Sequence, residues 1–466
     1  MNDRCKKSYF TEFTYTRKIH PNTPLINPYR YNMRHTDDRT ITDLAAQFGT
    51  PLWVYDAASI RRRIADLRQF DTIRFAQKAC SNTHILRLMR EEGVAVDAVS
   101  LGEIERALHA GYTTGTGDDK TGGKSDDESD DESVDKSEIV FTADLIDRPT
   151  LAKVIALRIP VNAGSIDMLD QLGAESPGHA VWLRINPGFG HGHSQKTNTG
   201  GEQSKHGIWH ADLPQALARI RRYGLRLIGL HMHIGSGVDY AHLSNVCDAM
   251  VQLVVDMQHD ISAISAGGGL SIPYRAGEAQ VDTAHYFSLW DAARKKLESH
   301  LGHRVKLEIE PGRYLVAEAG TLVTEVRAAK NMGANHFTLV DAGFNELMRP
   351  AMYGSYHEIS MIPRPDASMG LGHRPLRETV VAGPLCESGD VFTQEDGGIV
   401  TRRRLPDPQI GDLLVFHDTG AYGASMSSNY NSRPLTAEVL VENGRARLIR
   451  RRQTIAELLA LENFTD

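Results

Sequence analysis

A lysine that closes a short apolar run is the first residue of this sequence that could do chemistry. The run TIRFAQK, residues 72–78, has the composition of a buried strand and ends in Lys78, and Ser81 or Asn82 stands where the N-cap of a following helix belongs. A lysine at a strand end usually extends its amine into solvent. Held in a partly dry site, the same amine can act as a nucleophile in Schiff-base chemistry. The stretch alone leaves both interpretations open.

Two motifs further along the chain could bind charged groups. The stretch AGGGL holds three glycines at residues 267–269, whose successive N–H groups could converge on an anion, although such triplets also form ordinary turns. Ser236, in the stretch HMHIGSG, could add a hydroxyl to the same anion. The stretch EPGR places Glu310 close to Arg313, as a structural ion pair or as the charged groups of a site.

Four histidines offer a different chemistry. His231 and His233 are two residues apart on a predicted strand and so face the same way, and His191 and His193 lie in a long glycine- and histidine-rich loop, residues 184–208. Together they make a zinc site an alternative. No carboxylate or cysteine stands at a supporting spacing, however, and zinc would leave the glycine triplet unexplained. A histidine ring stacked on a planar cofactor fits the motifs better.

Pyridoxal 5′-phosphate is planar, carries a phosphate and needs a lysine. On this interpretation Lys78 attaches to the cofactor, the glycine loop holds the phosphate, and Glu310 faces the ring nitrogen. A carboxylate at that place keeps the nitrogen protonated, which makes the ring a strong acceptor for the electrons left when a bond to Cα breaks. The motifs therefore predict pyridoxal 5′-phosphate as cofactor.

Eight short apolar or β-branched runs alternate with amphipathic stretches and would position these groups. The predicted strands are residues 72–78, 94–99, 138–142, 159–163, 180–186, 226–234, 263–267 and 306–310. This alternation predicts an α/β fold, a (β/α)₈ TIM barrel, with a doubly wound open sheet as the alternative. In such a barrel the active site lies at the carboxyl ends of the strands, where the unusual residues of this chain collect.

The pattern changes near residue 320, where β-like runs with turns between them replace the alternation. We predict a cofactor-binding barrel over residues 46–318, followed by a mostly β C-terminal domain over residues 319–466. Residues 1–45 form a predicted N-terminal extension, whose aromatic and threonine content is compatible with strands that join the β domain.

The net charge of −7 is concentrated in one segment. Residues 118–138 hold ten acidic residues and three lysines, which leaves 49 acidic and 49 basic residues in the rest of the chain. The absence of a basic excess argues against nucleic acid as a partner. Because the segment is polar and almost without apolar residues, we predict a disordered insertion, with bounds at 115–137, in the barrel.

The remaining composition bounds the location of the protein. No apolar run approaches the roughly 20 residues that span a bilayer, and the basic N-terminus has no apolar stretch of the secretory type. The four cysteines, Cys5, Cys80, Cys247 and Cys386, are scattered and have no CxxC spacing. Together these features predict reduced thiols in a cytoplasmic protein with no membrane partner.

The chain resembles the diaminopimelate decarboxylase family, of the alanine racemase/ornithine decarboxylase fold group, in an ordered set of motifs. These motifs are FAQKACSN, HMHIGSG, AGGGLS, EIEPGR, LMRPAMYGSYH, GPLCESGDVF and HDTGAYGASMSSNYNSRP. The resemblance runs from about residue 45 to 462. It implies a barrel with a β domain, decarboxylation of meso-2,6-diaminopimelate to L-lysine and CO₂ as the last step of lysine biosynthesis, and a homodimer with shared active sites.

The resemblance also implies a role for each matching residue. The catalytic residues are Lys78, which carries the cofactor, His233, which stacks on its ring, and Cys386, a proton donor that enters with Glu387 from the partner subunit. The implied cofactor-binding residues are Lys78, His233, Ser236, Gly267, Gly268, Gly269, Glu310, Pro311, Gly312, Arg313 and Tyr422. The implied substrate-binding residues are Arg313, Arg349, Tyr353, Glu387 and Tyr422, and no metal ligand is implied.

The residues themselves support a dicarboxylic substrate. A carboxylate at the far end of the substrate calls for an arginine, whose planar fork binds it through two hydrogen bonds, and MRPAMY supplies Arg349 with Tyr353. The alternative is a structural arginine and a packed tyrosine in the β domain. Another decarboxylase of the group acting on arginine or ornithine, an amino-acid racemase, and a non-catalytic regulatory homologue are the rival functions.

Overall fold

The computed structural model describes residues 36–115, 137–190, 199–233, 235, 237, 239–366 and 370–463, all within one compact unit that spans His35–Asp466. Several of the positions named above lie outside the described residues. These are the extension up to residue 35, the interior of the predicted insertion, His191, His193 and Ser236.

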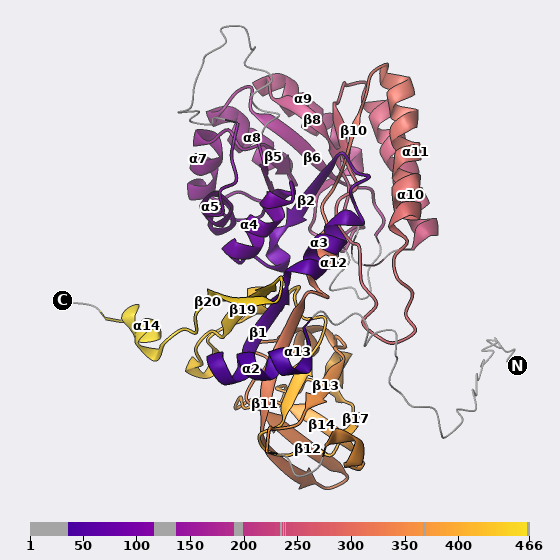
Figure 1. The fold of residues 1–466 in the computed structure, drawn as a ribbon. Coiled ribbons are helices and arrows are strands. Elements are labelled where there is room, and N and C mark those ends of the chain that lie inside the picture. The colour runs from indigo at the N-terminus through magenta and orange to yellow at the C-terminus, as the bar shows by residue number, and fades with distance from the viewer. Residues whose placement is uncertain are drawn as a thin grey trace, which may run out of the picture. The chain divides into compact units, whose positions relative to one another are not determined.

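Eight parallel strands form a closed barrel (Figure 1). They are β2 (Thr72–Ala76), β3 (Ala95–Ala98), β4 (Ile139–Ala143), β5 (Val161–Ala163), β6 (Ala180–Asn186), β8 (Arg226–His231), β9 (Ala263–Ser265) and β10 (Lys306–Ile309). The strands are paired in the order β5-β4-β3-β2-β10-β9-β8-β6, and β5 also pairs with β6, which closes the ring; the short β7 (Ile208–Trp209) extends from β6. The predicted barrel is confirmed, and the open sheet is excluded.

Helices cover the outside of the barrel. They are α3 (Ala57–Ala65), α4 (Thr83–Glu91), α5 (Leu101–His109), α7 (Arg148–Ala156), α8 (Ile166–Glu175), α9 (Leu213–Tyr223), α10 (Tyr240–Met257), α11 (Thr283–Leu301) and α12 (Arg313–Val316), with the 3₁₀ turns η1 (Gln77–Ala79) and η3 (His210–Asp212). As predicted, Asn82 caps α4 by accepting from the His84 N–H at 3.0 Å. Gly224 ends α9 in the left-handed conformation.

A second, mostly antiparallel sheet follows the barrel in the chain. Its strands are β1 (Leu52–Asp56), β11 (Gly320–Met332), β12 (Asn335–Val340), β13 (Ile359–Ile362), β14 (Leu376–Ala382), β17 (Arg403–Pro406), β18 (Leu413–Phe416), β19 (Ala437–Glu442) and β20 (Arg445–Arg450). The remaining elements are α2 (Asp38–Phe48), α13 (Arg349–Tyr353), α14 (Ile455–Ala460), the hairpin strands β15 (Gln394–Glu395) and β16 (Ile399–Val400), and the 3₁₀ turns η4 (Leu371–His373), η5 (Asp396–Gly398), η6 (Ala424–Met426) and η7 (Tyr430–Ser432). This sheet confirms the predicted change of pattern.

Strand β1 belongs to the second sheet although it precedes the barrel strands in the chain. It pairs in an antiparallel manner with β11 and in parallel with β19, and Figure 1 shows the indigo strand beside the yellow ones. The pairing brings residues inside the predicted barrel range 46–318 into the sheet of the C-terminal strands. Helix α2 packs on this sheet through Ile41 and Leu44.

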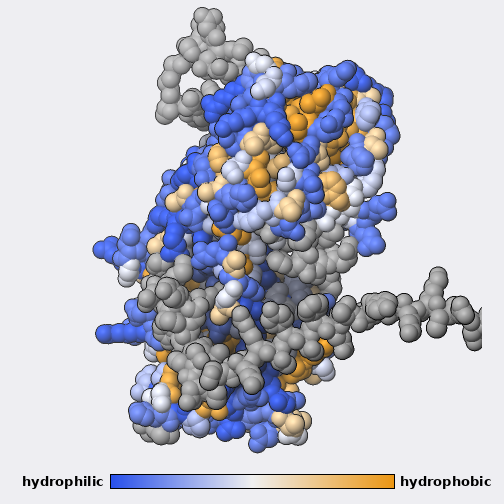
Figure 2. All heavy atoms as spheres, turned by 90° about the vertical axis from the view of Figure 1, so that its right-hand side faces the viewer, coloured by the Kyte–Doolittle hydropathy of each residue, from blue (hydrophilic) through white to orange (hydrophobic). Residues whose placement is uncertain are grey.

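One large core joins the barrel to the second sheet. The same apolar cluster contains Phe75 and Leu230 of the barrel and Leu322 and Phe416 of the sheet. The face that carries α10 and α11 is mostly hydrophilic, with smaller hydrophobic areas between (Figure 2). Within the described ranges, no helix combines the length and the apolar character needed to cross a bilayer.

Candidate active site

Lys78 lies in a turn at the carboxyl end of β2. The strand ends two residues earlier than predicted, at Ala76, and η1 presents the exposed Lys78 while its neighbours in the turn are buried. The Ala76 N–H donates to the Pro311 carbonyl at 3.2 Å, and the Ala79 carbonyl accepts from the Tyr422 N–H at 2.8 Å. The backbone thus holds the lysine between the EPGR segment and the loop that carries Tyr422.

The amides of the glycine triplet have side-chain partners in this conformation. The Gly267 N–H donates to the Ser265 hydroxyl at 3.2 Å, and the Gly268 N–H donates to Nδ1 of His233 at 3.1 Å. The role of the triplet in binding an anion stays a prediction. The bond from Gly268 requires a lone pair on Nδ1 and orients the His233 ring.

The glycines are nevertheless required by their surroundings. A Cβ atom at Gly267 would lie 2.4 Å from the Met232 carbonyl oxygen, and one at Gly269 would lie 2.4 Å from the Gly235 carbonyl oxygen. Both residues also have positive φ angles, +59° and +105°. The glycines therefore let the loop after β9 pack directly against the backbone of the segment after β8, beside His233.

Glu310 is buried at the carboxyl end of β10, with 8% of its surface exposed. Its Oε2 lies 2.8 Å from Nε2 of His231, and its Oε1 accepts from the Ser265 hydroxyl at 3.3 Å. Burial raises the pKa of Glu310, but the His231 ring, its hydrogen bond and the Arg74 and Arg184 guanidinium groups outweigh burial and leave the pKa below its ordinary value. The carboxylate is therefore ionised in a site with little water.

Further charges lie inside the barrel near Glu310. Arg74 and Glu308 form a buried ion pair, with Nε and Oε2 2.6 Å apart. Burial, followed by the charge of Glu310, raises the pKa of Asp97 well above its ordinary value. His231 thus has a carboxylate partner, and the described part of the chain contains no group of three histidine, cysteine or acidic residues that could hold a metal ion.

Two arginines, the buried Arg349 and the half-buried Arg313, lie together beside Tyr274. Arg313 donates through Nη1 to the Tyr274 hydroxyl at 2.9 Å, and the Arg349 guanidinium lies 4.9 Å from the centre of the Tyr274 ring. Burial and the charge of Arg313 lower the pKa of Arg349. Neither arginine forms an ion pair with a carboxylate among the described residues. A buried guanidinium without a carboxylate partner is costly, so this pair fits an anionic ligand.

Two tyrosines that were predicted to bind the substrate, Tyr353 and Tyr422, lie close to the same arginines. Tyr422 has a positive φ of 58°, and its ring centre lies 5.1 Å from the Arg313 guanidinium carbon. Tyr353 ends α13, the helix that Arg349 begins. Burial lowers the pKa of Arg313, but its interactions with Tyr274, Tyr422 and Tyr353 outweigh burial and leave the pKa above its ordinary value. The structure therefore brings together Lys78, Tyr422, Arg313, Arg349 and Tyr353.

Cys386 and Glu387 lie apart from this group. Both are exposed on the loop after β14, where the Cys386 N–H donates to Oδ1 of Asn431 at 2.9 Å. Among the described residues, no hydrogen bond or ion pair joins either of them to Lys78, Glu310 or the arginines. Within one chain, the predicted proton donor is not connected to the other site residues.

Sequence reasoning missed three residues that shape the site. Ser265 contacts both Glu310 and Gly267, Tyr274 contacts both arginines, and His357 accepts a hydrogen bond from Arg349 at 2.9 Å. His357 stands in the motif LMRPAMYGSYH, and Tyr274 follows the glycine triplet by five residues. Their positions in or near the motifs were a signal that could have indicated them. The contacts of Tyr274 with Arg313 and of His357 with the His417 carbonyl, however, join residues far apart in the chain.

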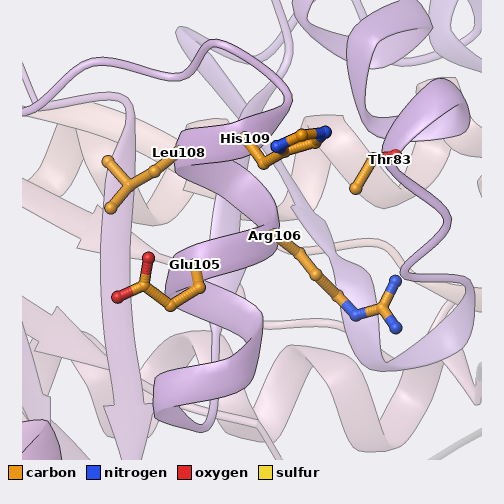
Figure 3. Close-up of a pocket in the computed structure, with 5 residues that line it drawn as sticks. All are labelled: Thr83, Glu105, Arg106, Leu108 and His109. Carbon is orange, nitrogen blue, oxygen red and sulfur yellow. The ribbon is translucent and has the colours of Figure 1, made fainter.

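A separate depression lies on the outside of the barrel. Figure 3 shows Glu105, Arg106, Leu108 and His109 along α5, with Thr83 at the start of α4. These residues take part in surface contacts, such as the bond from Arg106 Nη1 to the Ser81 carbonyl at 3.0 Å. None of them belongs to the group around Lys78.

Known proteins share both the sequence and the fold. The family model for the pyridoxal-binding domain of pyridoxal-dependent decarboxylases matches residues 57–317. Diaminopimelate decarboxylase of Escherichia coli strain K12 is 67% identical over 419 residues, covering 90% of this chain and 95% of that protein. The Streptomyces coelicolor diaminopimelate decarboxylase is 63% identical over 426 residues, covering 91% and 92%.

Solved structures give the same result. A crystal structure of a diaminopimelate decarboxylase has 66% identity and a TM-score of 0.84, covering 91% of this chain and 96% of that one. The Helicobacter pylori enzyme complexed with L-lysine has 27% identity and a TM-score of 0.75, covering 91% and 99%. With sequence and fold in common over nine tenths of its length, the chain belongs to the diaminopimelate decarboxylase family of pyridoxal-dependent decarboxylases.

Proposed function

We propose that the protein removes one carboxyl group from meso-2,6-diaminopimelate and releases L-lysine and CO₂, the last step of lysine biosynthesis. The observation that carries the proposal is the pair formed by the half-buried Arg313 and the buried Arg349. The two arginines have no carboxylate partner in the described chain, and they adjoin the turn of Lys78 through Tyr422. An enzyme acting on ornithine needs an acid at this place to bind the distal amine. Close relatives that carry the name diaminopimelate decarboxylase support the same substrate.

Pyridoxal 5′-phosphate fits the residues at the strand ends. We assign Lys78 to the attachment of the cofactor. The backbone at residues 267–269, with Ser236, Gly312 and Tyr422, would hold the cofactor's phosphate. When bound, the cofactor supplies an acceptor for the electron pair that CO₂ leaves on Cα. His233, oriented by the Gly268 N–H, is the ring to lie against the cofactor.

Glu310 is the group to keep the cofactor's ring nitrogen protonated. Its carboxylate is held in place by His231 and Ser265 and stays ionised although it is buried. An ionised acid in a site with little water interacts strongly with a cationic N–H because the local dielectric constant is low. Pro311 and Gly312 join Glu310 to Arg313, so that one short segment serves both the cofactor and the substrate.

The substrate's retained carboxylate is the partner for the two arginines. The product is L-lysine, so the carboxylate that stays is the one on the L centre, at the far end from the bond that breaks. Arg313 and Arg349 are to bind it through charge-assisted hydrogen bonds, with the hydroxyls of Tyr353 and Tyr422 nearby. Fixing this end leaves the other carboxyl group at the reacting centre.

A homodimer with shared sites completes the proposal. Cys386 and Glu387 are exposed and unconnected to the other site residues of their own chain, which supports their entry into the site of a second copy. Three large hydrophobic residues, Met352, Ile399 and Tyr430, expose between 41% and 62% of their surface. Met352 and Tyr430 directly precede Tyr353 and Asn431 in the chain, which supports an interface with a second copy at this surface. In that arrangement the Cys386 thiol returns a proton to Cα and Glu387 binds the substrate.

The location and the domain bounds are proposals as well. We place the protein in the cytoplasm, because its cysteines have no pairing pattern and its substrate is a biosynthetic amino acid. We retain a cofactor-binding barrel at residues 46–318 and a β domain at 319–466. Strand β1 lies within the first range in the chain but belongs to the sheet of the β domain.

Product analysis tests the proposed function. Purified protein with added pyridoxal 5′-phosphate should convert meso-diaminopimelate to L-lysine and CO₂ in equal amounts. The control variant Lys78→Ala should bind the cofactor weakly, should lack a borohydride-reducible bond to it, and should form no lysine. Absence of lysine from the unmodified, cofactor-loaded protein would contradict the proposal.

A further inference from the structure

His357 makes contacts that no role assigned above explains. It lies just before β13, and only 3% of its surface is exposed. Its Nδ1 lies 2.9 Å from the His417 carbonyl oxygen, and its Nε2 lies 2.9 Å from Nη1 of Arg349. A carbonyl oxygen can only accept, so Nδ1 carries the proton. A guanidinium can only donate, so Nε2 carries the lone pair.

The two partners therefore fix one neutral tautomer of His357. Protonation at Nε2 would remove the acceptor for Arg349 and place two cations in contact. Burial, followed by the charge of Arg349, lowers the pKa of His357 well below its ordinary value, so the ring stays neutral at physiological pH. A neutral acceptor is an uncommon partner for a buried arginine, because a carboxylate would bind it more strongly. It orients Arg349 and leaves the arginine's charge available to a ligand.

A residue of the barrel, Tyr274, also contacts His357. The Tyr274 ring meets the His357 ring edge to face, with centres 5.5 Å apart and an angle of 85° between the planes. Next to it, the Arg275 guanidinium lies 4.2 Å from the centre of the Tyr356 ring. Two successive residues of the loop after β9 thus pack on two successive residues of the segment before β13. The second sheet and the barrel jointly fix the position of His357.

We propose that His357 is a positioning residue for the retained carboxylate of the substrate: it accepts from Arg349, fixes the direction of that guanidinium, and is itself held by the His417 carbonyl and by Tyr274. The inference rests on the proposed function, since it assigns a residue that acts through Arg349. It adds a specificity determinant that does not touch the substrate. Preorganising an arginine in this way strengthens carboxylate binding without neutralising the arginine.

Two substitutions separate the two hydrogen bonds of His357. In His357→Gln, the amide oxygen can take the place of Nε2 and still accept from Arg349. In His357→Asn, the shorter amide can take the place of Nδ1 and still donate to the His417 carbonyl, but it cannot reach Arg349. We expect His357→Asn to raise the KM for meso-diaminopimelate about tenfold, with a smaller change in kcat, and His357→Gln to stay closer to the unmodified protein. His336→Asn, in β12 of the same sheet, is the matched control and should change neither constant.

A double variant distinguishes positioning from a general structural role. If His357 acts through Arg349, then adding His357→Asn to Arg349→Lys should cost much less than it does alone, because the bond to Nη1 is already lost. The inhibition constant of L-lysine, which keeps the same carboxylate, should rise in parallel with KM. The affinity for pyridoxal 5′-phosphate, followed by absorbance, should not change in the single variants.

Several outcomes would overturn the inference. These are additive losses in the double variant, equal effects of the Asn and Gln variants on kcat and KM, or an unchanged KM in His357→Asn. If His357→Asn does not fold, Tyr274→Leu in the loop after β9 provides the second test. It removes the ring that contacts both Arg349 and His357 and should raise KM, whereas an unchanged KM contradicts the inference. If the unmodified protein forms no lysine, the proposed function fails instead, so the two failures are distinguishable.

Discussion

At the scale of single residues, the site depends on the partner that each charged group is given. Glu310 is buried beside His231 and remains ionised, whereas Asp97, in the same barrel interior, has a raised pKa. Arg74 has a carboxylate partner in Glu308, but Arg349 has a neutral histidine. Glu308 thus neutralises the charge of Arg74 within the barrel. The charge of Arg349 is not neutralised by its histidine partner, and we propose that it binds the substrate.

A conservative substitution tests the role of the ionised carboxylate. Glu310→Gln keeps the shape and a hydrogen bond with His231 but removes the negative charge that we propose to lie at the cofactor's ring nitrogen. We expect a loss of about a hundredfold or more in kcat, or about 2.7 kcal/mol, with cofactor binding retained. Steady-state kinetics and an absorbance titration of the cofactor measure both. Near-normal turnover would show that Glu310 only partners His231.

At the scale of elements, turns and caps bring the site residues together from distant parts of the chain. The turn η1 after β2 is bonded to the EPGR segment and to the loop of Tyr422, and the glycine triplet after β9 is bonded to the segment after β8. The sequence indicated each strand and its carboxyl end to within a few residues. It did not indicate Tyr274, whose partner Arg313 is 39 residues away, or His357, whose Nδ1 partner, the His417 carbonyl, is 60 residues away.

We predict that the fold does not need the acidic segment that lies within residues 118–138. Its flanks meet, because the Glu138 N–H donates to the Thr113 carbonyl at 3.0 Å and the Glu138 carboxylate accepts from the Thr113 N–H at 2.6 Å. A short Gly/Ser linker in place of residues 116–136 should therefore leave kcat and Tm nearly unchanged. Kinetics and thermal unfolding of the linker variant provide the measurement. A large fall in either would show that the segment packs on the enzyme or binds a ligand.

A structural histidine should make the barrel sensitive to acid. His179 is fully buried, with Nε2 2.8 Å from the Ile159 carbonyl oxygen and Nδ1 3.1 Å from the Ser176 hydroxyl. Burial lowers its pKa from the ordinary value of 6.5. Below that pH the unfolded chain binds a proton that the folded chain resists, so the free energy of unfolding falls as the pH falls towards the folded-state pKa, by up to about 1.4 kcal/mol per unit for this group.

The substitution His179→Gln isolates this contribution. The variant can still donate to the Ile159 carbonyl but takes up no proton, so its free energy of unfolding should fall less steeply than that of the unmodified protein between pH 7 and 5. Urea unfolding at several pH values measures the two slopes. Parallel slopes would contradict a neutral, titration-resistant His179.

At the scale of the whole molecule, the barrel could be predicted and the complete site could not. Eight alternating runs and a glycine-rich motif after β9 predict the barrel and its active end, because each strand is a local apolar run. The pairing of β1 with β11 and β19 could not be predicted, since it joins residues more than 200 positions apart. Likewise, the distance in the chain between Lys78 and Cys386 does not indicate whether Cys386 belongs to the site of its own chain, to that of a second copy, or to neither.

Subunit complementation tests whether two chains build each site. Lys78→Ala and Cys386→Ala should each be inactive or nearly so. Mixed and allowed to exchange, they should regain up to about a quarter of the unmodified activity, because half of the dimers are mixed and each mixed dimer has one intact site. No recovery, with subunit exchange verified by tagged chains, would place Cys386 in the site of its own chain or outside any site.

The central claim is that two arginines without carboxylate partners select an amino acid with a second carboxylate. A competition assay tests it most directly: the cofactor-loaded protein receives equal concentrations of meso-diaminopimelate, L-ornithine, L-arginine and L-lysine, and mass spectrometry quantifies every decarboxylated product. The predicted result is L-lysine formed from isotopically labelled meso-diaminopimelate, with none of the three amines that loss of CO₂ would give from ornithine, arginine and lysine. Formation of one of these amines at a comparable rate, or racemisation of a substrate without loss of CO₂, would contradict the account.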